Sequence, residues 1–416
     1  MAPQKTLQAF LATARAALTA PPSRRSTPLH FVVGNESADL DSLCSALLLA
    51  YFRSHEPPHT LHIPLCNLAR DDLALRPELG AVLRRAAVTP DDVLTLTDLP
   101  GVDSLRPEDT RWLLVDHNVM TGALGRTYGS RVVGCVDHHE DEGKVSRDAS
   151  PRVVEKCGSC ASLVVAQCAG TWDALAREPE GARRTNAQLA YLALAPVLID
   201  TNNLRSRDKT TARDERAVAV AEARILEDGG AGAGAAEAEA EAYDRDRFFA
   251  HVAALKEDLS AMSLRDILRK DYKEWTADGG GARLGMSSAP QSFAFLVAKA
   301  GDEEAFVREL ERWGVGRGID VVVVLTTSKD DRGTFRRELL VWARSGPEVA
   351  AAVKKFAGGA GREKLGLGTW GDGRLDAEDG EGGWRRCWTQ ARVENSRKQI
   401  APMLREALKG VSAAKT

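Results

Sequence analysis

Short apolar runs alternate with longer helix-like segments from residue 29 to about residue 214 of the chain. The short runs are rich in β-branched residues, as expected for the buried strands of a parallel sheet. The expected strands are residues 31–33, 61–65, 94–97, 112–115 and 131–136. Because alternating strands and helices build a sheet that is covered on both faces, we predict an α/β fold with a doubly wound parallel sheet in this N-terminal region.

Polar side chains that can bind metal ions follow the apolar runs. They are Asn35, Asp39 and Asp41 after residues 31–33, Asp116 and His117 after residues 113–115, Asp137, His138 and His139 after residues 132–136, and Asp200 after the apolar segment 190–199. An isolated Asp-His-His could merely cap a strand, but right-handed crossovers bring the C-terminal ends of parallel strands to one edge of a sheet. Carboxylates and an amide mixed with imidazoles suit Mn²⁺, Mg²⁺ or Co²⁺ better than a structural zinc ion. We therefore predict a metal site at this edge, with two ions.

A stretch rich in glycine and alanine separates this region from the rest of the chain. Residues 229–234 are all glycine or alanine, and the Ala-Glu repeats that follow are solvated and helix-prone. We predict a catalytic domain over residues 1–215, a flexible linker over residues 216–242 and a smaller domain over residues 243–416. The smaller domain has a helical start at residues 248–268 and buried strands at residues 319–325 and 338–342, so we expect an α+β fold there.

The composition narrows the class of protein. The 416 residues carry a formal net charge of −3, whereas nucleic-acid binders usually have a basic surplus, so we expect no nucleic-acid partner. No apolar run reaches the length of a bilayer span, so we expect no membrane association. The seven cysteines, an odd number, lie in apolar segments and predict buried, reduced thiols in the cytoplasm. Cys157 and Cys160 have redox-motif spacing, but Gly158 and Ser159 between them are better explained as the start of a helix that faces the site.

The N-terminus allows two interpretations. The first 35 residues contain no Asp or Glu. Apolar side chains recur there at helical spacing, at Leu7, Phe10, Leu11, Ala14 and Leu18. Such a segment resembles a mitochondrial transit peptide, which would place the protein in the mitochondrial matrix. Cleavage would leave little chain before the first strand, so we expect instead a helix that packs on the first domain of a cytoplasmic protein.

The polar segments also resemble the motifs of a known family. The strings at residues 35–42, 116–118 and 137–139, followed by the lone Asp200, resemble in order and spacing the four motifs of the DHH phosphoesterase superfamily. Near the C-terminus, Ser396-Arg397-Lys398 is similar to the signature of the DHHA2 domain. That domain is shared by family II inorganic pyrophosphatases, fungal-type exopolyphosphatases and prune-like proteins. The resemblance thus covers both predicted domains.

The resemblance implies a role for each matching residue. It implies a first ion held by Asn35, Asp39 and Asp116, and a second ion held by Asp41, Asp116, His138 and Asp200, with Asp116 as the bridge. His139 would contact the terminal phosphate or the leaving oxygen, while Asp137 and His117 would orient the ligands. Arg397 and Lys398 would bind the phosphate chain, with the Arg as a bidentate fork and the Lys as a point charge. Further candidates are Arg205, Arg207 and Lys209, although a solvated turn explains these equally well.

One departure separates this chain from the pyrophosphatases of the family. They have a histidine where this chain has Asn35, and an amide oxygen should shift the preference from Mn²⁺ toward Mg²⁺. Together with the length of the chain, the difference resembles the fungal exopolyphosphatases, so we predict release of terminal orthophosphate from linear inorganic polyphosphate by a monomeric enzyme. A prune-like short-chain polyphosphatase or cyclic-nucleotide phosphodiesterase with an interaction role, and a manganese-dependent pyrophosphatase, remain alternatives.

Overall fold

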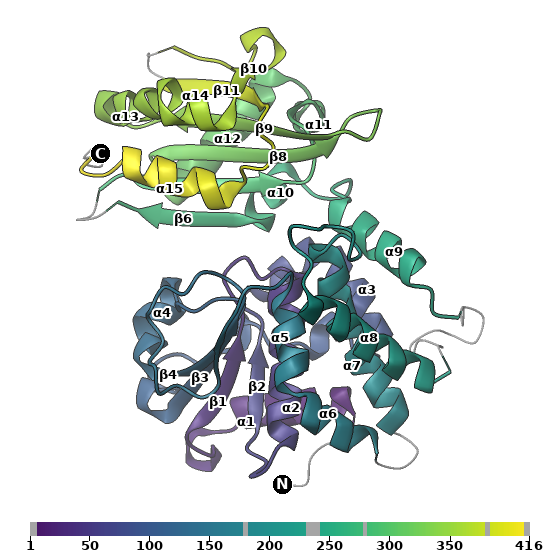
Figure 1. Ribbon diagram of the computed structural model, residues 1–416. Helices are drawn as coiled ribbons and strands as arrows, with labels where there is room; N and C mark the ends of the chain where they lie inside the picture. Colours follow the sequence, from purple (N-terminus) through teal and green to yellow (C-terminus); the bar gives the residue numbers. More distant parts are fainter. Residues whose placement is uncertain (1–5, 178–181, 230–241, 278–280, 379–382, 412–416) are drawn as a thin grey trace. The chain divides into compact units, whose positions relative to one another are not determined.

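The chain forms two compact units that divide between Lys256 and Glu257 (Figure 1). The computed structural model describes residues 6–177, 182–229, 242–277, 281–378 and 383–411. The division lies later than the domain start that we expected at residue 243, because helix α9 (Arg245–Glu257) buries Phe248 and Val252 in the core of the first unit. Helix α8 (Ala212–Glu227) occupies the first part of the expected linker, and residues 230–241 lie outside the described residues.

The first unit is built on a five-stranded sheet in the order β2-β1-β3-β4-β5, and every neighbouring pair is parallel. Its strands are β1 (Leu29–Val33), β2 (His62–Leu65), β3 (Thr110–Val115), β4 (Val132–Asp137) and β5 (Arg152–Val154). The predicted parallel sheet is therefore confirmed. The strand expected at residues 94–97 is wrong, because Thr95 forms only a single bridge with Cys66 before a capping box with Asp98 starts a 3-10 helix.

Helices cover both faces of this sheet (Figure 1). They are α1 (Leu7–Thr19), α2 (Leu40–His55), α3 (Pro77–Arg85), α4 (Gly122–Tyr128), α5 (Cys160–Gln167), α6 (Ala169–Ala176), α7 (Ala182–Asp200), α8 and α9. Short 3-10 helices lie at Pro22–Arg24, Arg70–Leu75, Pro90–Asp92, Leu96–Asp98, Pro107–Asp109 and Gly129–Arg131. Val32 and Val115 point into the core formed with α2, α5 and α7, whereas Phe31 and Leu114 point toward α4. This alternation explains why the strands are apolar throughout.

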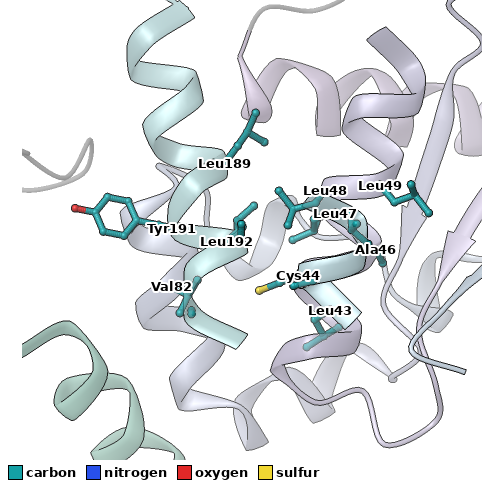
Figure 2. Close-up of a cluster of buried hydrophobic side chains, with 14 of the residues drawn as sticks. Leu43, Cys44, Ala46, Leu47, Leu48, Leu49, Val82, Leu189, Tyr191 and Leu192 are labelled. Atoms are coloured by element: carbon teal, nitrogen blue, oxygen red, sulfur yellow. The ribbon is translucent and has the colours of Figure 1, made fainter. Parts of the chain in front are cut away.

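The larger core lies where α2, α3 and α7 meet (Figure 2). Leu43 and Leu47 of α2 lie close to Val82 of α3 and Leu192 of α7, and all four side chains are buried. Because α2 is buried along almost its whole length, both polar residues at its first turn, Asp41 and Ser42, are held away from water as well. The packing of α2 therefore fixes the first motif.

The N-terminal helix packs on the first unit, as predicted. Leu7, Leu11 and Leu18 of α1 are fully buried. Arg15 of the same helix forms an ion pair with Asp98 at 2.7 Å and also donates to the carbonyl of Val93. Within the described residues, no helix has the length and apolarity that crossing a bilayer requires.

The second unit carries a six-stranded mixed sheet in the order β10-β11-β9-β8-β7-β6. Its strands are β6 (Tyr272–Thr276), β7 (Arg283–Ala289), β8 (Val321–Lys329), β9 (Phe335–Ala343), β10 (Leu367–Thr369) and β11 (Trp384–Gln390). Its helices are α10 (Leu264–Lys270), α11 (Phe293–Ala300), α12 (Glu303–Arg317), α13 (Gly346–Gly358), α14 (Ala360–Leu365) and α15 (Arg397–Ala407), with a 3-10 turn at Gly371–Gly373. Only β7 and β8 pair in parallel, so the expected mixed α and β domain is confirmed.

All seven cysteines are buried and unpaired, as expected of reduced thiols. Burial raises the pKa of each of them, for example that of Cys66 to about 12. Cys157 and Cys160 do not form a disulfide, and Cys160 begins helix α5.

Candidate metal centre at the edge of the parallel sheet

The candidate site lies where the order of the strands in the parallel sheet reverses. Strand β1 is followed by β2 on one side and has β3 on its other side, and ligand sites of open α/β sheets lie at such switch points. The segments after β1, β3 and β4 carry Asn35, Asp116 and His138. Gly34 allows α2 to start directly behind this loop, because a Cβ at Gly34 would lie 2.6 Å from the Cβ of Ser42.

Asp116 is the centre of the site. Its backbone is left-handed, with φ of 61°, and its side chain is 3% exposed. Its Oδ2 accepts hydrogen bonds from the Ser42 hydroxyl at 2.6 Å and from Asn35 Nδ2 at 2.8 Å. Its Oδ1 lies 3.1 Å from His138 Nε2 and 3.7 Å from His139 Nδ1. Asp116, His138 and His139 thus offer three ligand atoms close enough together to hold a metal ion.

The amide of Asn35 is turned differently from the metal-ligand role that we expected. Its Oδ1 accepts from the backbone N–H of Ser37 at 2.8 Å and of Ala38 at 3.3 Å, so its nitrogen must be the atom that faces Asp116. In this arrangement Asn35 positions Asp116, and its oxygen stays with its own loop.

Asp41, a buried residue of α2, accepts the hydrogen bonds of the first residues of helix α5. Its carboxylate accepts from the backbone N–H of Cys160 at 2.6 Å and of Ala161 at 2.9 Å, and from the Ser159 hydroxyl at 2.8 Å. The start of helix α5 therefore binds an anion, as predicted, and this anion is the carboxylate of Asp41. His138 Nε2 lies 3.8 Å from Asp41 Oδ2, which joins Asp41 to the cluster.

The two remaining predicted acidic ligands lie on helix ends. Asp39 is the N-cap of α2, and its Oδ1 accepts from the N–H of Ser42 at 3.1 Å. Asp200 ends helix α7, so the apolar segment before it is a helix and not a further strand end. Burial and the charge of Asp41 raise the pKa of Asp200 to about 7, so the two carboxylates influence each other.

The electrostatics of the cluster favour a bound positive charge. Burial and neighbouring carboxylates raise the pKa of Asp116, and burial raises that of Asp41. Burial disfavours the charged form of His138, but its hydrogen bond to Asp116 and the charge of Asp41 outweigh this and raise its pKa to about 12. The proton on His138 therefore neutralises the carboxylates, which is a task that a divalent cation fulfils equally well. The donor set thus fits a hard or borderline metal ion.

His139 belongs to a chain of hydrogen bonds that ends at Asn118. His139 Nδ1 lies 2.8 Å from Asp137 Oδ1, and Asn118 Nδ2 donates to Asp137 Oδ2 at 2.6 Å. A carboxylate accepts only, so Nδ1 carries the hydrogen and Nε2 is the ring nitrogen left for chemistry. Asn118 is buried and directly follows Asp116-His117, yet sequence reasoning gave it no role. His117 itself points back to its strand, with Nδ1 2.9 Å from the carbonyl of Val115.

Comparison with known proteins identifies the family. Residues 30–195 match the DHH family, N-terminal domain, and residues 251–407 match the DHHA2 domain. A protein of Schizosaccharomyces pombe named "Putative exopolyphosphatase" is 31% identical over 391 residues, which cover 92% of each chain. The chain belongs to the DHH family of phosphoesterases. The human protein named "Exopolyphosphatase PRUNE1" is 24% identical over 405 residues, 97% of this chain and 79% of the human one.

A solved structure shares the fold of this DHH-family chain. The "putative family II inorganic pyrophosphatase" of Methanococcus jannaschii superposes with a TM-score of 0.55 over 91% of this chain and 99% of that one, at 20% sequence identity. The manganese-dependent inorganic pyrophosphatase of Methanocaldococcus jannaschii is 23% identical over 299 residues. Both the DHH sheet and the DHHA2 sheet therefore have relatives of known architecture.

Two further residues of the first unit position the site, and sequence reasoning missed both. Arg76 is buried and donates to the carbonyls of Ser37 and Ala38, the latter at 3.0 Å, so it clamps the loop between Asn35 and Asp39. Asp214 is fully buried and accepts from the N–H of Gly158 at 2.9 Å, which fixes the turn before α5. Asp214 could have been read from its capping box with Thr211, whereas no local pattern marks Arg76.

The predicted phosphate-binding cations have varied surroundings. Arg205 is held by Asp246 at 2.8 Å, and Arg207 and Lys209 are exposed. In the DHHA2 domain, Arg397 forms an ion pair with Asp271 at 2.8 Å, while the side chain of Lys398 is exposed at the first turn of α15.

Proposed function

We propose that this protein is a metal-dependent exopolyphosphatase that releases terminal orthophosphate from linear inorganic polyphosphate. The observation that carries the proposal is the group formed by the buried Asp116 and the half-buried His138 and His139 at the switch point of the sheet, with Asp41 beside it. The name of the Schizosaccharomyces pombe relative, which is similar over nearly the whole chain, supports polyphosphate as the substrate.

The residues of the cluster would hold two divalent ions, Mg²⁺ or Mn²⁺, with Co²⁺ as a further candidate. Asp41, Asp116, His138 and Asp200 would hold one ion, and Asp39 with Asp116 the other. Asn35 would join the second set only if its amide turned, since its nitrogen faces Asp116 in this arrangement. When bound, the ions would activate a water molecule and polarise the phosphoryl oxygens.

The remaining predicted site residues would bind the phosphate groups of the substrate and transfer a proton to the leaving oxygen. His139, oriented by Asp137, would present Nε2 to the terminal phosphate or to the leaving oxygen, and Asn118 would hold Asp137 in place. Arg397 and Lys398 would neutralise phosphate oxygens, with Arg205 and Lys209 as further candidates. His117 would orient its neighbours through the strand from which it extends.

Pyrophosphate is the alternative substrate with a specific observation in its favour. The pyrophosphatase fold covers 91% of this chain. Against it stands Asn35 in the place of the histidine that the resemblance implies for pyrophosphatases. A prune-like activity on short chains or cyclic nucleotides is the other alternative, since the human PRUNE1 relative aligns along 97% of the chain.

Two readouts separate these candidates, each measured with Mg²⁺ or Mn²⁺. Phosphate release is measured on pyrophosphate, tripolyphosphate and long-chain polyphosphate, and formation of the nucleoside monophosphate is measured on a cyclic nucleotide. We expect the highest kcat/KM on a polyphosphate, the loss of hydrolysis after chelation with EDTA, and its recovery when the metal is restored. Preferred hydrolysis of pyrophosphate or of the cyclic nucleotide would overturn the substrate assignment. Full activity after exhaustive chelation would overturn the metal mechanism.

A further inference from the structure

A charged cavity of about 560 Å³ lies on the second unit, and none of the residues that line it has been given a role above. It is bordered by the start of α10, by the hairpin of β6 and β7, and by the C-terminal half of α12. The charged side chains that line it are Arg265, Arg283, Arg312, Arg317, Glu274 and Glu309. Four arginines against two glutamates leave two positive charges in excess.

The ion pairs show where the excess charge is located. Glu274 is paired with Arg283, and Glu309 is paired with Arg312 at 2.7 Å. Arg265 and Arg317 are both exposed, and neither has a carboxylate partner within the part of the chain that the structure describes. The cavity therefore keeps two guanidinium groups available for an anion from outside.

Aromatic side chains hold Arg317 in one orientation. Its guanidinium lies 4.4 Å from the ring centre of Tyr272 and 4.5 Å from that of Trp313. The two rings meet edge to face at an angle of 86°, and Trp313 is buried. Because the rings are nearly perpendicular, a planar guanidinium can stack flat on only one of them and meets the other with part of its edge, so the rest of its N–H edge remains available as hydrogen-bond donors. A restrained arginine loses less conformational entropy when it binds an anion than a mobile one does.

We propose that this cavity, whose lining residues all belong to the second unit, is a second binding site for linear polyphosphate. The proposal rests on the proposed function for its ligand. Guanidinium groups match phosphate oxygens in a bidentate manner, and four of them around one cavity suit an anion with a charge on every unit. The Arg317 guanidinium already covers Tyr272 and Trp313, which argues against a nucleotide, because its base would need such a ring for stacking. An enzyme that holds the chain at a second place can keep it bound between successive cleavages.

The test measures binding without hydrolysis. Tripolyphosphate and long-chain polyphosphate are titrated into the full-length protein by calorimetry in the presence of EDTA, where the metal centre cannot contribute. The double variant Arg265→Ala/Arg317→Ala removes the two unpaired guanidinium groups. We expect its Kd for long-chain polyphosphate to rise by about tenfold or more, from the loss of charge-assisted hydrogen bonds.

Arg308→Ala is the matched control. Arg308 lies on the same helix α12, is 58% exposed and pairs with Glu304, so its removal changes the charge of the helix outside the cavity. We expect this variant to bind as the unmodified protein does. The control removes one positive charge and the double variant two, so a loss of binding free energy in the control of half that in the double variant would mean that only the overall charge matters and would overturn the site. An unchanged Kd in the double variant would overturn it as well.

The result does not depend on the enzymatic activity. If polyphosphate binds to the unmodified protein in EDTA and the double variant does not bind it, the second site stands even if no phosphate is released when metal is added. If polyglutamate or ATP binds more tightly than polyphosphate in the same titration, the proposed class of ligand is wrong. With metal present, we expect the double variant to raise KM for long chains more than KM for tripolyphosphate.

Discussion

At the scale of single residues, Asp116 combines a left-handed backbone with a buried carboxylate whose two oxygens have different neighbours. Such a backbone costs an aspartate about 1 kcal/mol, which the hydrogen bond from Asp116 N–H to the Val136 carbonyl and those from Ser42 and Asn35 to its side chain offset. The turn directs Oδ1 toward His138 and His139, while Oδ2 accepts the hydrogen bonds from Ser42 and Asn35. Any change of this side chain should therefore affect both sides of the site.

Asp116→Asn should lower kcat by several orders of magnitude on polyphosphate, because it removes the charge that both proposed ions share. Asn35→Ala should cost less, since it removes one hydrogen bond to Asp116 and no charge. Steady-state phosphate release by both variants, with circular dichroism to verify folding, provides the comparison. Similar small losses for the two variants would contradict a bridging role for Asp116.

Arg76→Lys should weaken metal binding more than it slows the chemistry, because a lysine cannot reproduce the two hydrogen bonds to Ser37 and Ala38. We expect the metal concentration for half-maximal activity to rise by about tenfold, with kcat at saturating metal little changed. Arg84→Lys, at an exposed position of the neighbouring helix α3, is the control. A fall in kcat with no change in metal dependence would show that Arg76 does not act through the loop.

At the scale of elements, an ion pair between Arg15 and Asp98 ties the N-terminal helix α1 to the 3-10 helix Leu96–Asp98. Burial opposes ionisation of Asp98, but hydrogen bonds from Thr95, Arg15 and Arg70 lower its pKa to about 2. The group therefore stabilises the folded protein above its ordinary pKa of about 4, and this contribution is lost as the pH falls toward 2. Its location, between α1 and the 3-10 helices, makes it the polar counterpart of the buried leucines of α1.

Asp98→Asn should lower the free energy of unfolding at pH 7 by about 2 kcal/mol. The difference from the unmodified protein should shrink as the pH is lowered from 4 toward 2, which urea unfolding at a series of pH values would measure. Asp92→Asn is the control, since Asp92 forms the same kind of capping box with Thr89 and has no arginine partner among the described residues. A loss for Asp98→Asn that is constant with pH would contradict the role of its charge.

The elements also show what the sequence could predict and why the rest escaped. The strands at residues 31–33, 112–115 and 131–136 were readable because burial on both faces makes them apolar throughout. Residues 94–97, Leu-Thr-Leu-Thr, also have a strand-like composition, yet the capping box of Thr95 with Asp98 bends them into a turn. The sequence did not show that Asp200 ends a helix, because an apolar run of ten residues is compatible with either a helix or a strand. The role of Arg76 was hidden, since its partners lie 38 and 39 residues earlier.

At the scale of the whole molecule, each unit has its own sheet and its own core. The two family matches, over residues 30–195 and 251–407, agree with this division. The residues with proposed metal-binding roles lie in the first unit and the signature cations in the second. Changes to one set can therefore be tested without disturbing the fold of the other.

Arg397→Ala and Lys398→Ala should each lower kcat/KM on tripolyphosphate by roughly 10², the effect of losing one charge-assisted contact of about 3 kcal/mol. Metal binding, followed by calorimetry without substrate, should stay unchanged. Arg405→Ala, an exposed position later on the same helix α15, is the control. Near-normal kcat/KM in both variants would make the two cations ordinary surface residues.

The burial of every cysteine makes the folded protein react slowly with thiol reagents. The thiols are inaccessible, and burial raises their pKa, so little of the reactive thiolate is present. A single cysteine introduced on the surface, for instance at Lys398, would then be the one site that a maleimide dye labels rapidly. Unfolding would expose seven thiols at once, so the number of dyes attached per chain would report the unfolded fraction. The folded protein thus gives almost no labelling background, which suits it to single-molecule measurements on variants that carry one dye.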